Sequence, residues 1–150
     1  MAVNGVNQIS AANAWVMSLK KLQEEQREQQ VLQKLRVIDM KVRAHEMAHL
    51  IAAQGIAVFG PHYEYVRGPD GRMYAVGGEV NIDTSPVPGD PEKTIEKAEK
   101  IVRAALAPVN PSPQDYRVAQ QAEMMKQKAT LEKEQEEKDQ EDTQRISVIV

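Results

Sequence analysis

Apolar residues recur along the first part of the chain at nearly helical spacing, and one polar run interrupts them. The interruption, residues 23–30, has no apolar residue on any side. It therefore predicts a solvated helix or a coiled-coil fragment, with a mostly disordered arm as the alternative. We expect residues 1–34 to form a polar helical arm that is frayed over residues 1–9 and begins after an N-cap at Ser10. The recurring apolar residues are Trp15, Leu19, Leu22, Val31, Leu32, Leu35 and Ile38.

The next segment, from Leu35 to Gln54, contains neither glycine nor proline. A single helix can therefore run through it, and Gly55 is a natural signal for its end. The apolar period then changes, because β-prone residues at 63–66 and 73–76 enclose a Gly-Pro-Asp-Gly turn at 68–71. This arrangement predicts a β-hairpin.

Beyond the hairpin, Gly77 and Gly78 precede an alternating run over residues 79–83, which predicts a further strand. Two glycines at this place would let the backbone of that strand approach another segment closely.

Two helix starts follow. Asp90 is a good N-cap with Pro91 at the first helical position, and Ser112 begins another helix with Asp115 placed as in a capping box. The composition becomes almost wholly charged or amide-bearing from Lys126, so we expect residues 126–150 to form a charged helical or disordered tail. Its apolar end, residues 145–150, is consistent with an added strand, a partner-binding segment or a loose end.

These elements together predict an α+β fold. Residues 35–125 would form a minimal zincin-like domain, with one motif-bearing helix, a small antiparallel hairpin or sheet and two further helices. Aromatic residues make up only 4% of the chain, so its core must consist of aliphatic side chains and methionine.

The bulk composition limits the function. A net charge of −3 gives no electrostatic case for nucleic-acid binding, and the absence of cysteine excludes both disulfides and a thiolate zinc site. The N-terminus lacks the features of a signal peptide, and no apolar run is long enough for a membrane span. We therefore expect a soluble cytoplasmic protein, with signal-independent export left open.

The candidate chemistry lies at residues 45–49, which read His-Glu-Met-Ala-His. On a helix, positions i and i+4 share one face, so the imidazoles of His45 and His49 can face one metal ion. Glu46 would then lie beside the metal, where it could act as a general base on a water that the metal activates. The alternative is a pair of structural histidines on a half-exposed helix face.

A zinc hydrolase needs a third protein ligand, and three residues qualify. We favour Glu79, because it follows two glycines on a predicted strand and a later carboxylate completes the zinc sites that have two histidines and one glutamate. Asp83 shares that strand face and could instead orient a histidine ligand. His62 is the only other histidine in the chain.

Several motifs occur together and in one order: Val42–Glu46, Arg67–Gly71, Tyr74–Val80, Ile82–Thr84, Pro86–Pro91 and Ala104–Pro108. In these segments the chain resembles the SprA-related family, bacterial proteins assigned as metalloproteases by their His-Glu-x-x-His motif. The resemblance covers roughly residues 36–122 and does not include the arms. It implies a peptidase-like domain with His45 and His49 as zinc ligands and Glu46 as the base.

We therefore expect a zinc peptidase that acts on peptide or protein substrates through His45, Glu46, His49 and Glu79. The alternative function is a non-catalytic module, with or without metal, that presents its helical arms to a partner or to a second copy of itself.

Overall fold

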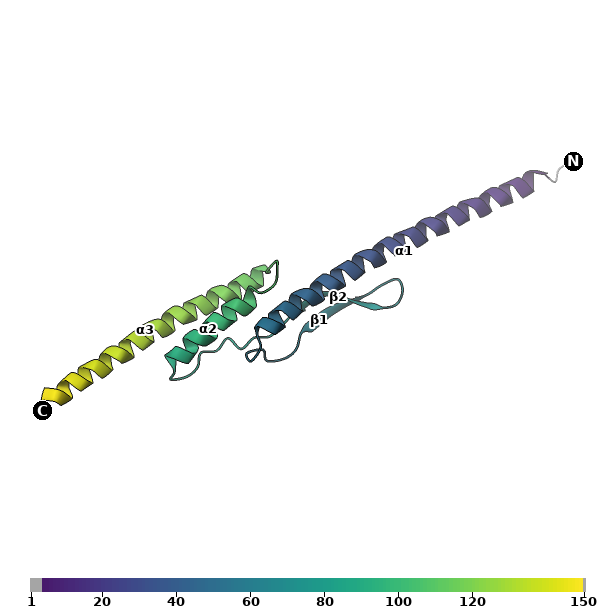
Figure 1. The fold of residues 1–150 in the computed structure, drawn as a ribbon. Coiled ribbons are helices and arrows are strands. Elements are labelled where there is room, and N and C mark those ends of the chain that lie inside the picture. Colours follow the sequence, from purple (N-terminus) through teal and green to yellow (C-terminus); the bar gives the residue numbers. More distant parts are fainter. Residues whose placement is uncertain (1–3, 150) are drawn as a thin grey trace. The chain divides into compact units, whose positions relative to one another are not determined.

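The computed structural model describes the backbone of residues 4–149 and the side chains of residues 10–149. Three helices and one two-stranded sheet make up this part of the chain, so the predicted α+β class is confirmed. In chain order the elements are α1 (Asn4–Ala52), β1 (His62–Arg67), β2 (Met73–Glu79), α2 (Pro91–Ala105) and α3 (Pro113–Ile149) (Figure 1). No helix among the described residues combines the length and the apolar character that crossing a membrane requires.

The contacts divide the chain into two units. The first comprises Met1–Lys41 and Glu64–Gly77, and the second comprises Val42–Tyr63 and Gly78–Val150. The domain boundaries expected after residues 34 and 125 fall inside α1 and α3. As limits of independently folding parts, those boundaries stay predictions.

In the first unit, the expected arm is helical, but it begins earlier than predicted. α1 starts at Asn4, so Ser10 lies inside the helix and its predicted role as N-cap is wrong. The backbone is helical from residue 4, so the fraying predicted over residues 1–9 is wrong for residues 4–9. Residues 1–3 lie outside the described part. The side chains from Ser10 to Val31 are all exposed, and Leu32 is the first buried one. The polar composition explains this exposure, because it offers no continuous apolar face to bury.

The predicted hairpin is confirmed. Its turn contains Gly71 with a φ of +78°, a backbone conformation that glycine adopts without strain. The hydroxyl of Tyr74 donates to Asp70 Oδ2 across the turn at 2.6 Å. A carboxylate oxygen of Asp39 on α1 accepts the backbone N–H of Ala75 at 2.8 Å, which ties β2 to the helix within the first unit.

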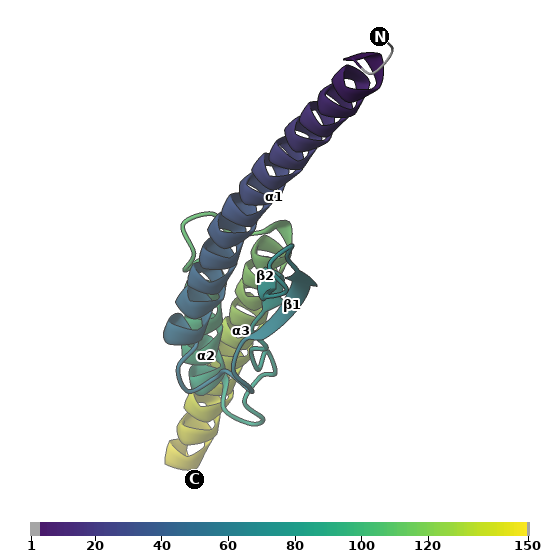
Figure 2. The ribbon, with the colours of Figure 1, turned by 90° about the vertical axis from the view of Figure 1, so that its right-hand side faces the viewer.

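In the second unit, α2 and α3 pack side by side (Figure 2). Small side chains fill their contact and allow a close approach of the two helices. Two ion pairs, Glu99 with Lys126 at 2.9 Å and Glu92 with Lys133 at 3.3 Å, connect the helices at their rim. The buried residues of the two helices include Ala98, Ile101, Ala104, Ala105, Ala119, Ala122 and Ala129.

α3 continues past this contact as an exposed helix to Ile149. The described part of the tail is therefore helical, and the alternatives of a disordered tail or an added strand over residues 145–149 are wrong. Val150 lies outside the described residues.

The strand predicted over residues 79–83 is also wrong, because β2 ends at Glu79. The segment after it is extended but makes only one isolated antiparallel bridge, between Ala57 and Ile82. Two hydrogen bonds flank that bridge: Val58 N–H donates to Asn81 C=O at 2.9 Å, and Asp83 N–H donates to Ile56 C=O at 2.8 Å. The alternating pattern identified an extended segment correctly, but the chain facing it turns at residues 53–56 and bends at residues 58–60, so only one bridge forms.

Candidate metal centre

The two histidines of the motif lie on the last turns of α1, in the second unit. Their Nε2 atoms are 3.1 Å apart, and the two rings meet edge to face. The helical spacing of four residues explains why both rings emerge on one side. The ring of His49 is buried, whereas that of His45 remains partly accessible.

A carboxylate from the first turn of α3 completes this cluster. Asp115 Oδ2 lies 3.3 Å from His45 Nε2, and Asp115 Oδ1 lies 3.2 Å from His49 Nε2. One ligand atom from each of the three residues falls within 4.8 Å of the others. The cluster can therefore hold a metal ion with two nitrogen donors and one oxygen donor.

The separations fit tetrahedral zinc. Zinc binds imidazole nitrogen and carboxylate oxygen at about 2.0–2.2 Å, and a tetrahedron of that size has edges of about 3.3–3.6 Å. The two imidazole nitrogens are 3.1 Å apart, and each has one oxygen of the Asp115 carboxylate at a similar distance: Oδ2 lies 3.3 Å from His45 and Oδ1 lies 3.2 Å from His49. These separations are close to those edges. Three protein donors would leave the fourth tetrahedral position for water or substrate.

The proton position on His49 supports the same role. Its Nδ1 lies 2.9 Å from the carbonyl oxygen of Ala104, at the end of α2. A carbonyl oxygen can only accept, so Nδ1 carries the proton and donates. In a neutral ring, Nε2 then presents a lone pair toward the cluster, where it faces another acceptor, the carboxylate of Asp115. A cation between these two atoms would relieve their repulsion, and such a backbone bond typically orients histidine ligands.

Asp115 is held in place by the cap of its own helix. The backbone N–H of Ser112 donates to Asp115 Oδ2 at 2.6 Å, and the N–H of Asp115 donates to Ser112 Oγ at 3.2 Å. This is the capping box that the sequence predicts. Burial alone would raise the pKa of the Asp115 carboxyl, but the Ser112 hydrogen bonds and the nearby His49 and His45 lower it below its usual value. The charged form suited to a cation is therefore favoured.

Glu46 lies beside the cluster and is only 4% exposed. Its Oε2 is buried without a hydrogen-bond partner. Burial raises the pKa of the Glu46 carboxyl, against the opposing effect of His45 and His49, while Asp115 and Glu79 raise it further. An orphaned carboxylate oxygen of this kind is suited to receive a proton from a water or substrate.

Gly78 makes this placement of Glu46 possible. A Cβ atom on Gly78 would lie 2.8 Å from Glu46 Cγ and 3.0 Å from the backbone oxygen of His62. Neither distance leaves room for a side chain. The expected close approach at the double glycine thus occurs at Gly78, and the side chain that it accommodates is that of Glu46.

The cluster opens into a cavity of about 220 Å³. Glu79 lines this cavity together with His45, Glu46 and His49, but it is not among the three residues whose ligand atoms converge. Glu79 as a zinc ligand therefore stays a prediction, and the geometry offers Asp115 for that role.

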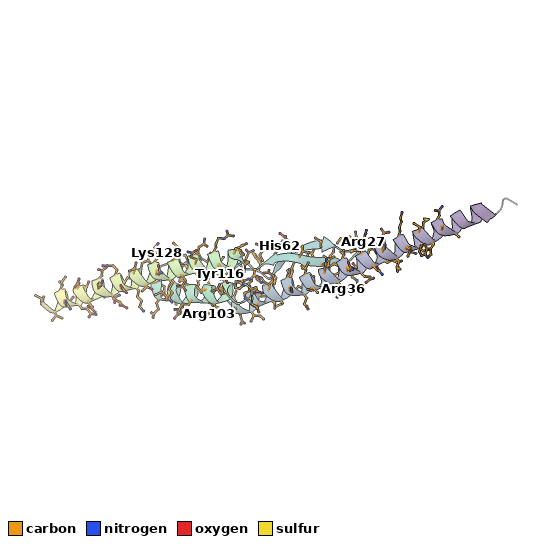
Figure 3. The ribbon with its side chains drawn as sticks, turned by 90° about the horizontal axis from the view of Figure 1, so that it is seen from above. Arg27, Arg36, His62, Arg103, Tyr116 and Lys128 are labelled. Carbon is orange, nitrogen blue, oxygen red and sulfur yellow. The ribbon has the colours of Figure 1, made fainter. Side chains whose placement is uncertain are left out.

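The other two candidates lie elsewhere. Asp83 accepts from Lys97 Nζ at 2.7 Å and from the backbone N–H of Ser85 at 2.9 Å, so its carboxylate is already engaged on the surface. His62 is exposed at the start of β1, where Figure 3 labels it, and it does not line the cavity.

The sequence does contain Asp115, but as a capping residue rather than as a ligand. The capping box explains an acid at this position completely, so the pattern gives no reason to seek a second role. The predicted helix start could have marked Asp115 as a candidate ligand, because a capping box holds a carboxylate in a fixed position at the end of the helix. Only the folded chain brings that end to the motif.

The second unit thus combines a helix-borne histidine pair, a carboxylate from another helix and a buried glutamate, an arrangement that defines a candidate metal centre in an α+β protein. The chain matches the model of the SprA-related family over residues 7–149 and belongs to that family. The match includes both arms, which the motifs recognised in the sequence did not cover. No curated protein and no solved structure matches the chain.

Proposed function

We propose that this protein is a zinc-dependent peptidase with a zincin-like domain. One observation supports it most: two imidazole nitrogens and a carboxylate oxygen converge beside the buried, unpaired Oε2 of Glu46. A purely structural histidine pair would need neither the third donor nor the orphaned glutamate.

We assign His45, His49 and Asp115 as the zinc-binding residues. Two nitrogens and one oxygen suit zinc, and the chain has no thiolate to compete. A zinc ion bound there would supply a Lewis acid that polarises a carbonyl group and acidifies water. The Ala104 carbonyl keeps the His49 ring in the tautomer that ligation requires, and Ser112 keeps the Asp115 carboxylate turned inward.

Glu46 is the general base in this proposal. Its free Oε2 accepts a proton from water as the water oxygen attacks the carbonyl carbon of a peptide bond. Glu46 then returns that proton to the amide nitrogen as the carbon–nitrogen bond breaks, which releases an amine and a carboxylic acid. The raised pKa of Glu46 suits both steps, because it makes the carboxylate a stronger base and lets its acid form persist to a higher pH than that of an ordinary glutamic acid.

The test is Glu46→Gln, which keeps the size of the side chain and removes the base. We expect hydrolysis of a mixed peptide library to fall by at least about 100-fold while bound zinc is unchanged. Glu96→Gln is the matched control, because Glu96 is exposed on α2 and lies outside the cavity. Full activity of Glu46→Gln would refute the mechanism.

A non-catalytic binding module is the second candidate. The observation that favours it is the exposed apolar side chains on the α1 arm, among them Trp15, which is 67% exposed. Bound zinc without turnover of any peptide would favour the module. Light scattering over a range of concentrations, with Trp15→Ala beside the wild type, would show whether the arm mediates self-association.

A further inference from the structure

Within the described part of the chain, the cavity at the candidate metal centre is lined by acidic side chains without basic ones to balance them. Three carboxylates line it, from Glu46, Glu79 and Asp115, whereas no lysine or arginine does so among the described residues. Asp115 is engaged by the histidines and by its helix cap, and Glu46 is buried against Gly78. Glu79 is exposed and lines the cavity, and its side chain makes no hydrogen bond or ion pair within the described part of the chain.

Glu79 also stands at the head of an extended segment with an open edge. Asn81 C=O and Asp83 N–H point toward residues 56–58, to which they bond. In an extended chain, successive residues direct their backbone groups to opposite edges. The N–H and C=O groups of Val80 and Ile82 therefore point to the other edge, where they have no backbone partner among the described residues, and both residues line the cavity.

We infer that Glu79 is a specificity-determining residue that binds a cationic group of an extended peptide lying along the Val80–Ile82 edge. This inference rests on the proposed peptidase function. A peptide chain paired with that edge would pass the histidine cluster, with one of its groups beside Glu79. An ammonium or guanidinium group there would neutralise the carboxylate of Glu79, which neither binds zinc nor serves as the base in the proposed function.

The cationic group has two sources, which correspond to two kinds of peptidase. A lysine or arginine side chain would make Glu79 a subsite for cleavage within a polypeptide. A free α-amino group would make it an anchor for the removal of N-terminal residues. Both sources present the same chemistry to Glu79, and suitable peptides distinguish them.

The experiment measures binding rather than turnover, using zinc-loaded Glu46→Gln protein so that the peptides stay intact. Three C-amidated peptides with a fluorophore near that end are compared by anisotropy. The first has an acetylated N-terminus and a central lysine, the second a free N-terminus and no lysine, and the third an acetylated N-terminus with glutamine in place of lysine.

We expect one of the two cationic peptides to bind about tenfold more tightly than the neutral one, as a charge-assisted contact typically allows. Adding Glu79→Gln should lower the affinity for that peptide to the affinity for the neutral peptide, and it should leave the zinc content unchanged. Adding Glu96→Gln should preserve the preference. The tighter peptide identifies the source of the cation.

Two results would overturn the inference. Equal affinity of all three peptides would show that Glu79 does not select charge, and loss of zinc in Glu79→Gln would show that Glu79 is a ligand instead. The proposed function is tested separately, by the zinc content of the wild type and by its hydrolysis of any of the three peptides.

Discussion

The Nε2 atom of His49 lies 3.2 Å from Oδ1 of Asp115, so the end of α1 and the beginning of α3 meet at one point of the second unit. Neither helix can form the donor set alone. A cation bound there would link the motif helix to the first turn of α3, and through the bond between His49 and Ala104 also to α2.

This linkage predicts that zinc stabilises the fold. A ligand that binds only the folded chain adds about 2.7 kcal/mol to the free energy of unfolding at 100 times its dissociation constant. We expect the melting temperature to rise with added zinc and to fall after chelation, as measured by circular dichroism. An unchanged melting temperature, with zinc shown to be bound, would contradict the link between the helices.

Gly78→Ala should disturb the centre through Glu46. The new methyl group would lie 2.8 Å from Glu46 Cγ, and crowding of this kind typically costs about 1–3 kcal/mol. We expect a lower free energy of unfolding and, if the protein is a peptidase, reduced turnover. Gly77→Ala is the matched control, because the only tight contact of its methyl group would be with the flexible end of the Glu64 side chain, at 3.1 Å from Oε2. Equal effects of the two variants would argue against the role of Gly78.

Ser112→Ala should weaken both the helix cap and the metal centre. The lost hydroxyl accepts the N–H of Asp115, and removal of an N-cap side chain costs about 0.5–2 kcal/mol. The backbone N–H of Ser112 that donates to the Asp115 carboxylate remains in this variant, but the loosened first turn of α3 should still lower zinc affinity, as measured by competition with a chromophoric chelator. Ser112→Thr keeps the hydroxyl and should restore both properties. A destabilised Ser112→Ala with unchanged zinc affinity would separate the cap from the centre.

The sequence predicted the local features of this fold well. Hairpin, turn and helix starts depend on glycine, proline and capping residues that act on their immediate neighbours, as at Gly71 and Asp90. The two histidines and Glu46 were likewise predictable from one helical turn. The beginning of α1 was placed too late, because Ser10 is a good capping residue that also fits inside a helix.

The long-range part was not predictable from pattern alone. Asp115 reaches the histidines only through the packing of α2 and α3, and nothing in its neighbourhood distinguishes a capping carboxylate from a ligand. Glu79 was favoured on the assumption that residues 79–83 form a regular strand, whereas they form a single bridge. Glu79 nevertheless lines the cavity beside the two histidines, so the pattern placed it near the site although it is not one of the converging residues.

Asp83 should contribute to stability in a pH-dependent way. Hydrogen bonds from Lys97 and Ser85 hold the pKa of Asp83 well below its usual value. A lowered pKa means that the stabilisation is present above the unfolded pKa of about 3.9 and is lost as the pH falls through the folded pKa. Wild type should therefore exceed Asp83→Asn in free energy of unfolding at pH 7, and the difference should shrink below about pH 4. A difference that does not depend on pH would contradict this assignment, and zinc content should be the same in both proteins.

The most direct test of the central claim is the zinc content of purified protein, measured by atomic emission for the wild type beside Asp115→Asn and Glu79→Gln. Both substitutions preserve side-chain size, and asparagine retains an oxygen for the cap, so circular dichroism should show unchanged helix content. The account predicts about one zinc per chain in the wild type and in Glu79→Gln, and a large loss in Asp115→Asn. Full zinc in Asp115→Asn together with loss in Glu79→Gln would contradict it.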